Sequence, residues 1–147
     1  MFTAAITAQL TTKQLEGAVH SVADLRSARV GVGPVRVGAV AGTASLGYLA
    51  RERINFRTYP DAASGLKAVK AGALDAFVYD RPLLYWLAKQ EYEDSIEVLD
   101  TTFDQQSYAI ALPDNSPLRT PINRALLALI HTQEWQDLNT KYLGDRL

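Results

Sequence analysis

Two short segments carry residue types that can bind a charged small molecule, and the first of them ends in Asp80. This acid follows the apolar run at residues 76–79 and stands shortly before Pro82, which can open a helix. Such a run is typical of a strand buried inside a parallel sheet. Ligands of these sheets bind beyond the carboxyl ends of the strands, so Asp80 is placed to meet one. The alternative is that Asp80 only caps the helix opened by Pro82.

The second segment is residues 42–45, in which a glycine precedes a helix start with two hydroxyl side chains. Gly42 lets the backbone bend and approach a ligand closely, while Thr43 and Ser45 lie beside the free N–H groups of the helix. The helix dipole favours an anion there. Taken alone, the segment is equally compatible with an ordinary threonine cap. Together with Asp80, however, it would match the two charges of a zwitterion.

Strands and helices that alternate along the chain must position these two segments. Strands are predicted at residues 35–40, 55–59, 76–79 and 96–99, and helices are predicted between them. This β-α-β-α-β-α-β order predicts an α/β fold with a right-handed parallel core. The two candidate segments then belong to one sheet.

The last third of the chain has a different character. A strand predicted at residues 107–112 leads into a turn, after which Ser116 and Pro117 provide the cap and first residue of a helix. A final helix is predicted from 132 to 143. The two helices carry apolar stripes, which indicate a lobe or partner chain that covers them; these residues are Leu118, Ile122, Leu126, Leu129, Trp135, Leu138 and Tyr142.

Composition excludes several classes of function. With 147 residues, 48% of them hydrophobic, the chain can form one domain or two small lobes. Its net charge of −1 provides no basic surface for nucleic acid. It has no cysteine, and neither His20 nor His131 has a second imidazole at metal-ligand spacing, so we expect no metal and no cofactor. No run of about 18 apolar residues predicts a membrane span, and the amino terminus lacks the pattern of a signal peptide.

Several motifs follow one another in an order that is more specific than any one of them, at residues 42–45, 65–80, 108–113 and 116–119 and at Trp135. This order resembles the later half of the type 2 periplasmic amino-acid-binding proteins, over residues 21–147. That family has two α/β lobes that close on an amino acid like a hinge. The resemblance implies a periplasmic-binding-protein-like type 2 fold, with a three-layer second lobe and carboxy-terminal helices that belong to the first lobe.

The resemblance also implies roles for single residues. Asp80 would form a salt bridge with the α-ammonium of the ligand, and the turn would line the ligand with backbone amides and hydroxyls. The implied ligand-binding residues are Gly42, Thr43, Ala44, Ser45, Tyr79 and Asp80. Many eukaryotic receptors have Ser-Thr where this chain has Ala44-Ser45, which leaves the identity of the amino acid open. The arginine and the aromatic residue that complete such sites belong to the first half of the domain, which this chain lacks.

The amino terminus resembles a further group of proteins. Residues 2–11 resemble the end of the pore-lining helix of ionotropic glutamate receptors and their prokaryotic relatives, and residues 21–25 and 116–123 also resemble parts of these receptors. The resemblance implies the remnant of a pore helix and a linker at 1–20, the second lobe at 21–104, a hinge strand at 105–112 and lobe-one helices at 113–147. The parent would then face the periplasm or the cell exterior.

Three classes of function remain open at this stage. The favoured one is a non-enzymatic amino-acid-binding portion of a receptor channel or of a transporter-linked protein. Its partners would be an amino acid, a first lobe or a second copy of the chain, and a pore or transporter. The second is the effector domain of a LysR-type regulator, although no helix-turn-helix precedes the domain. The third is an enzyme that uses Asp75, Asp80 or Glu52 as acid and base, but nothing in the sequence makes these residues converge.

Overall fold

The structure is a computed structural model that describes residues 2–9, 19–26, 28–29, 33–106 and 108–143. The chain divides into two compact units, Met1–Gln106 and Ser107–Leu147. Both segments that carry candidate ligand groups belong to the first unit.

The first unit is built on a five-stranded sheet with the strand order β5-β4-β6-β1-β7. Its strands are β1 (Phe2–Gln9), β4 (Val37–Val40), β5 (Phe56–Tyr59), β6 (Ala76–Asp80) and β7 (Ile96–Gln106). Strand β4 pairs in parallel with β5 and β6, whereas β1 pairs antiparallel with β6 and β7. The short strands β2 (Ala28–Arg29) and β3 (Gly33–Pro34) form a separate two-stranded sheet. The predicted α/β fold with a parallel core is therefore confirmed.

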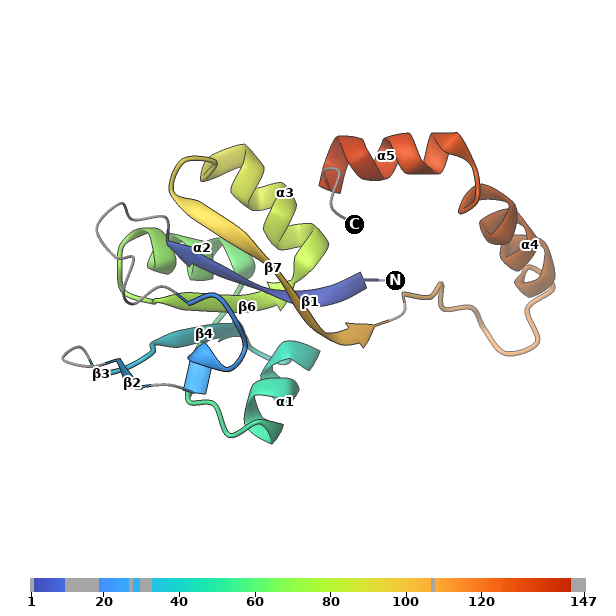
Figure 1. The fold of residues 1–147 in the computed structure, drawn as a ribbon. Coiled ribbons are helices and arrows are strands. Elements are labelled where there is room, and N and C mark those ends of the chain that lie inside the picture. Colours follow the sequence, from blue (N-terminus) through green and yellow to red (C-terminus); the bar gives the residue numbers. More distant parts are fainter. Residues whose placement is uncertain (1, 10–18, 27, 30–32, 107, 144–147) are drawn as a thin grey trace. The chain divides into compact units, whose positions relative to one another are not determined.

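Helices cover both faces of this sheet (Figure 1). Helices α2 (Ala62–Lys70) and α3 (Arg81–Glu91) pack on one face, and α1 (Ala44–Arg51) packs on the other, beside the 3-10 turn η1 (Asp24–Arg26). Val78 lies in the apolar cluster with Leu49 of α1, whereas Phe77 lies in the opposite cluster with Leu66 and Leu84. Successive side chains of β6 thus enter different cores. Burial on both faces explains why the run at residues 76–79 is continuously apolar.

The amino-terminal segment differs from the expectation. The resemblance implied the end of a pore helix, but residues 2–9 form strand β1, which fills the sheet between β6 and β7. Ala5 and Ile6 are fully buried on its two faces, and Oγ1 of Thr7 donates to the carbonyl of Phe77 at 3.2 Å. The backbone groups of β6 and β7 that face this gap need partners, and β1 supplies them. Residues 10–18 of the expected linker lie outside the described residues.

Strand β7 also differs from the expectation. It extends over 11 residues, whereas the sequence predicted a short strand at 96–99 and a second strand at 107–112. Pairing with β1 from Gln9↔Ile96 to Phe2↔Gln106 accounts for the greater length. Residues 108–112 have no regular structure, and Ser107 is outside the described residues. The strand part of the expected hinge at 105–112 therefore ends at Gln106.

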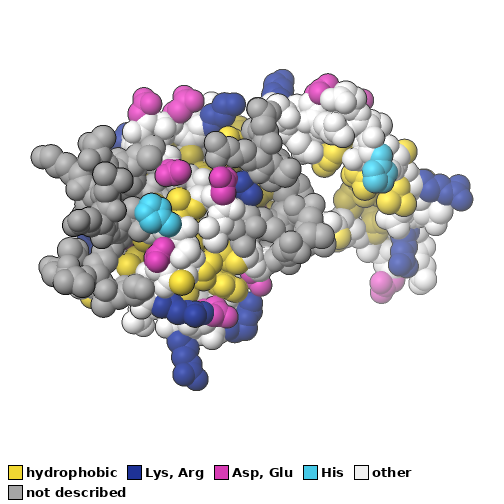
Figure 2. All heavy atoms as spheres, in the orientation of Figure 1, with side chains coloured by type: hydrophobic (Ala, Val, Ile, Leu, Met, Phe, Trp, Pro, Cys, Tyr) yellow, Lys and Arg dark blue, Asp and Glu magenta, His cyan; other side chains and the backbone are white. Residues whose placement is uncertain are grey.

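The second unit contains two helices, α4 (Arg119–Leu129) and α5 (Gln133–Leu143). Helix α4 begins later than predicted, because Pro117 and Leu118 form a turn in which the Leu118 N–H donates to Oγ of Ser116 at 3.3 Å. None of its residues is buried, and Leu127 is 61% exposed. Figure 2 shows hydrophobic side chains on the surface of this unit. In the described part of the chain, no helix has the length and apolar character needed to cross a membrane.

Candidate functional site

Asp80 occupies the junction between a buried strand and a helix. It is the last residue of β6 and the N-cap of α3, with Pro82 in the first turn. Its side chain is half-buried, yet it forms no cap hydrogen bond. The sequence left capping as the alternative role of Asp80, and the structure lacks the hydrogen bond that defines that role.

The electrostatic environment of Asp80 is unfavourable for its charge. Burial raises the pKa of its carboxyl group above the ordinary value, and the Leu83 N–H opposes this rise. The Asp80 side chain nonetheless makes no cap hydrogen bond to the start of α3. Among the described residues, no lysine or arginine forms an ion pair with Asp80. A ligand ammonium would therefore stabilise a carboxylate that has no counter-charge within the described residues.

The turn before α1 leaves backbone donors exposed to a ligand. Gly42 has a φ of +74°, and a Cβ built on it would meet open space. Thr43 is the N-cap of α1, but its Oγ1 donates to the carbonyl of Val40 at 2.8 Å and does not cap the helix. Ala44, the first helical residue, is exposed, whereas Ser45 is only 4% exposed. The first N–H groups of α1 thus have no cap from Thr43.

Parallel pairing brings the turn and Asp80 to the same edge of the sheet. Ala39 of β4 pairs with Val78 of β6, so both strands end at this edge. By the alternation along β6, Asp80 shares with Val78 the face on which α1 packs. The carboxyl group of Asp80 and the start of helix α1 therefore lie at one edge of two neighbouring strands, on the same face of the sheet.

Tyr79 is not brought together with the other predicted site residues. Its side chain packs against the apolar cluster that contains Phe77 and Leu84, on the face covered by α2 and α3. The alternation that directs Asp80 toward the α1 face directs Tyr79 away from it.

The acids considered for catalysis do not converge. Asp80 lies at the carboxyl edge of the parallel strands, whereas Asp75 precedes β6 at the amino edge, where it binds Arg36 at 2.8 Å. Glu52 follows α1 and forms an ion pair with Arg26. In the described part of the chain, no group of three or more acidic or histidine side chains is arranged to hold a metal ion. Among the described residues, these three acids therefore do not form an acid–base pair.

Comparison with known proteins relates this fold to amino-acid receptors. No protein-family model matches the chain. The chain is 28% identical over 138 residues to the L-cystine-binding protein TcyJ of Escherichia coli strain K12, a match that covers 92% of this chain and 49% of that protein. It is 31% identical over 87 residues to the ionotropic glutamate receptor subunit NMDA 2D of Mus musculus, a match that covers 58% of this chain and 7% of that protein.

A solved structure decides the fold. The ligand-binding core of GluR0 from Nostoc punctiforme, in complex with L-glutamate, matches 97% of this chain with a TM-score of 0.74 and 29% identity. The chain has a type 2 periplasmic-binding-protein fold. The resemblance found in the sequence is thus confirmed.

The chain spans only part of these type 2 relatives, namely 61% of the GluR0 core and about half (49%) of the cystine-binding protein. The three relatives are named as receptors and binding proteins, which is the class that the sequence predicted in preference to an enzyme.

Proposed function

We propose that the chain supplies one lobe of a two-lobed amino-acid-binding domain, in which Asp80 accepts the α-ammonium group of the ligand. The observation that carries this proposal is the half-buried carboxylate of Asp80, which has neither a cap hydrogen bond nor a cation among the described residues. The GluR0 core was solved with L-glutamate, and TcyJ is named for L-cystine. Both ligands are α-amino acids, so both carry the ammonium group that Asp80 would bind.

The turn at residues 42–45 is the proposed anion-binding part of the site. Gly42 keeps the approach to the backbone open, and Ala44 and Ser45 contribute N–H groups from the first turn of α1. Because Ser45 is buried, we assign its main role to the backbone and not to the hydroxyl. Thr43 holds the turn through its hydrogen bond to the Val40 carbonyl. Tyr79 would support the strand from the opposite face.

The proposed division of the domain follows from exposed apolar surface. Residues 21–104 would form the second lobe, and α4 and α5 would pack on a first lobe, which covers their exposed leucines. A first lobe would also add the remaining contacts, because binding sites usually bury about 70 to 90% of a ligand surface. The ligand would then bind on the extracytoplasmic side of the membrane.

Two parents fit this proposal. A receptor channel is favoured by the match to the NMDA 2D subunit and to the GluR0 core, and a transporter-linked binding protein is favoured by the match to TcyJ. The coding sequence upstream of Met1 distinguishes them. Two membrane spans, a pore loop and a first-lobe segment would support the channel, whereas a first lobe without membrane spans would support the transporter-linked protein.

Calorimetric titration of amino acids into a protein that contains both lobes tests the role of Asp80. Asp80→Asn keeps the size of the side chain and its ability to cap α3, but it removes the charge. The affinity should fall by a few kcal/mol, as usually happens when one member of a buried charge pair is lost. Unchanged affinity would show that Asp80 does not bind the ammonium group of the ligand.

A further inference from the structure

A hollow of about 450 Å³ lies at the edge of the sheet opposite to Asp80. Residues 34–35 and 54–55, directly before β4 and β5, line it together with the end of α1 and with η1. Its volume lies in the usual range for small-molecule sites, about 300 to 1,000 Å³. It contains none of the residues predicted from the sequence to bind the amino acid, so it is a separate feature of the lobe.

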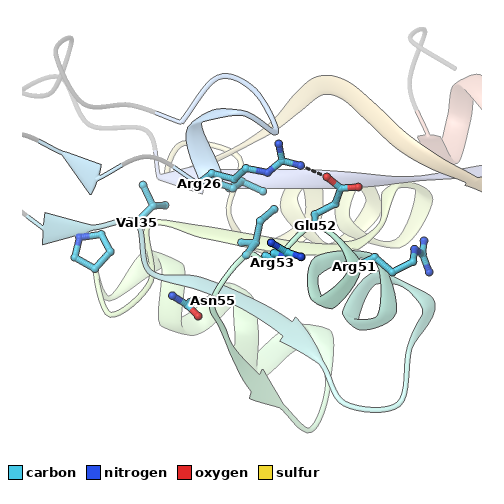
Figure 3. A pocket seen from close by; sticks show the side chains of 9 residues that line it. Arg26, Val35, Arg51, Glu52, Arg53 and Asn55 are labelled. Atoms are coloured by element: carbon cyan, nitrogen blue, oxygen red, sulfur yellow. Dashed lines mark hydrogen bonds and ion pairs between the residues drawn. The ribbon is translucent and has the colours of Figure 1, made fainter.

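Most of the charged side chains that line this hollow are cationic. Of the described residues that line it, Arg26, Arg51 and Arg53 are basic and Glu52 is acidic. Figure 3 shows Arg26 and Glu52 facing each other as an ion pair on one side of the hollow. Arg51 pairs with Asp104 at 3.1 Å. Within the described residues, Arg53 forms no ion pair, so its guanidinium group is the available charge.

The backbone of Arg53 adopts a conformation that is unusual for a residue other than glycine. Glu52 is the C-cap of α1, and Arg53 follows it with a φ of +56°. The Ile54 N–H donates to the Leu49 carbonyl at 3.0 Å, and the Arg53 N–H donates to the Ala50 carbonyl at 3.1 Å. This is a Schellman motif, in which the left-handed position is usually glycine because a Cβ is strained there. A strained arginine at that position indicates that its side chain has a use.

We infer that the hollow centred on Arg53 is a second ligand site, which binds a small organic anion through a phosphate or carboxylate group. The guanidinium fork matches the geometry of both groups and forms paired, charge-assisted hydrogen bonds with them. Leu25 and Ile54 give the hollow an apolar floor for the organic part. The inference is independent of the proposed amino-acid site, since the two lie at opposite edges of the sheet.

NMR titration of the 147-residue chain with phenyl phosphate and, separately, with benzoate tests the site. The first variant is Arg53→Gly, which removes the charge and also places the preferred residue in the left-handed position. Its melting temperature should equal or exceed that of the wild type, while its dissociation constant should rise about tenfold or more. Failure of the wild type to bind either probe, or equal binding by Arg53→Gly, would overturn the inference.

Two further variants separate a specific site from general attraction to a positive surface. Glu52→Gln removes the acid and frees Arg26, so it should bind the same probe more tightly than the wild type. Arg57→Gln removes an exposed arginine of β5 that does not line the hollow, so it should bind like the wild type. A loss in Arg57→Gln as large as that in Arg53→Gly would show unspecific charge attraction and would refute the site.

Discussion

Arg36 and Asp75 clamp the amino ends of β4 and β6 together. Nε and Nη2 of Arg36 donate to the two carboxylate oxygens of Asp75 at 3.0 and 2.8 Å, and the Arg36 backbone N–H donates to Oδ2 at 2.8 Å. In return, the Asp75 N–H donates to the Arg36 carbonyl at 2.9 Å. The hydrogen bonds that Arg36 donates to the Asp75 carboxylate raise the pKa of the guanidinium group. The clamp holds the strand pairing that brings Asp80 and Gly42 to the opposite edge of the sheet.

Replacing Asp75 should therefore cost stability. Asp75→Asn loses the charged acceptor of the paired hydrogen bonds. We expect the free energy of unfolding, measured in urea, to fall by about 1 to 2 kcal/mol. The loss should be smaller than for a fully buried ion pair, because Arg36 is partly exposed to solvent. Asp94→Asn, in an exposed turn, provides the control. Equal stability of the two variants would mean that the clamp contributes nothing measurable.

Asp80→Asn should have the opposite effect on stability when no ligand is present. Burial raises the pKa of Asp80, so between the ordinary and the raised pKa the folded protein binds more protons than the unfolded one. Stability then falls as the pH rises through this window. The variant should melt at a higher temperature than the wild type at neutral pH, and this difference should disappear below about pH 4. A lower melting temperature at neutral pH would instead indicate that the charged carboxylate stabilises α3.

Ala44→Pro tests the backbone donors at the start of α1. Ala44 is the exposed first helical residue, and Thr43 before it has φ −102° and ψ 162°, a conformation that suits a residue before proline. The fold should survive, and amino-acid affinity in a protein with both lobes should fall by about 1 to 3 kcal/mol through loss of one N–H donor. Ala44→Ser keeps the donor and serves as the control. Identical calorimetric affinities for the two variants would show that the ligand does not contact this N–H.

Two helical glycines should respond in opposite directions to the same substitution. A Cβ on Gly65 of α2 would lie 2.1 Å from Cε2 of Phe77, whereas a Cβ on Gly47 of α1 would lie 3.7 Å from Nη1 of Arg51. Gly65→Ala should therefore destabilise the protein by about 1 to 3 kcal/mol through overpacking. Gly47→Ala should stabilise it by about 0.5 to 1 kcal/mol through helix propensity. Chemical denaturation measures both, and a stabilised Gly65→Ala protein would show that α2 lies farther from β6.

The chain by itself should be a poor receptor. Without a first lobe, a bound amino acid would remain largely solvated, so calorimetry should detect no binding tighter than about millimolar. The exposed apolar residues of α4 and α5, such as Leu127 and Leu138, should also drive self-association in sedimentation experiments. Micromolar binding by a strictly monomeric sample would contradict both expectations.

The sequence determined the elements that depend on local patterns. The apolar run that ends in Asp80, with Pro82 after it, predicted both β6 and the start of α3. The alternation of short strands and amphipathic helices predicted the parallel core and, with it, the shared edge of Asp80 and Gly42. These features follow from residues within a few positions of one another, because helix and strand periods are short.

Tertiary structure alone decided the features that depend on distant partners. Residues 2–9 are rich in alanine and threonine, and they form β1 because the backbones of β6 and β7 lie on either side of them. The length of β7 depends on the same pairing. The hollow beside Arg53 needs η1, which comes from another part of the chain. Hydrogen-bond partners and burial are set by residues far apart in sequence, so no local pattern specifies them.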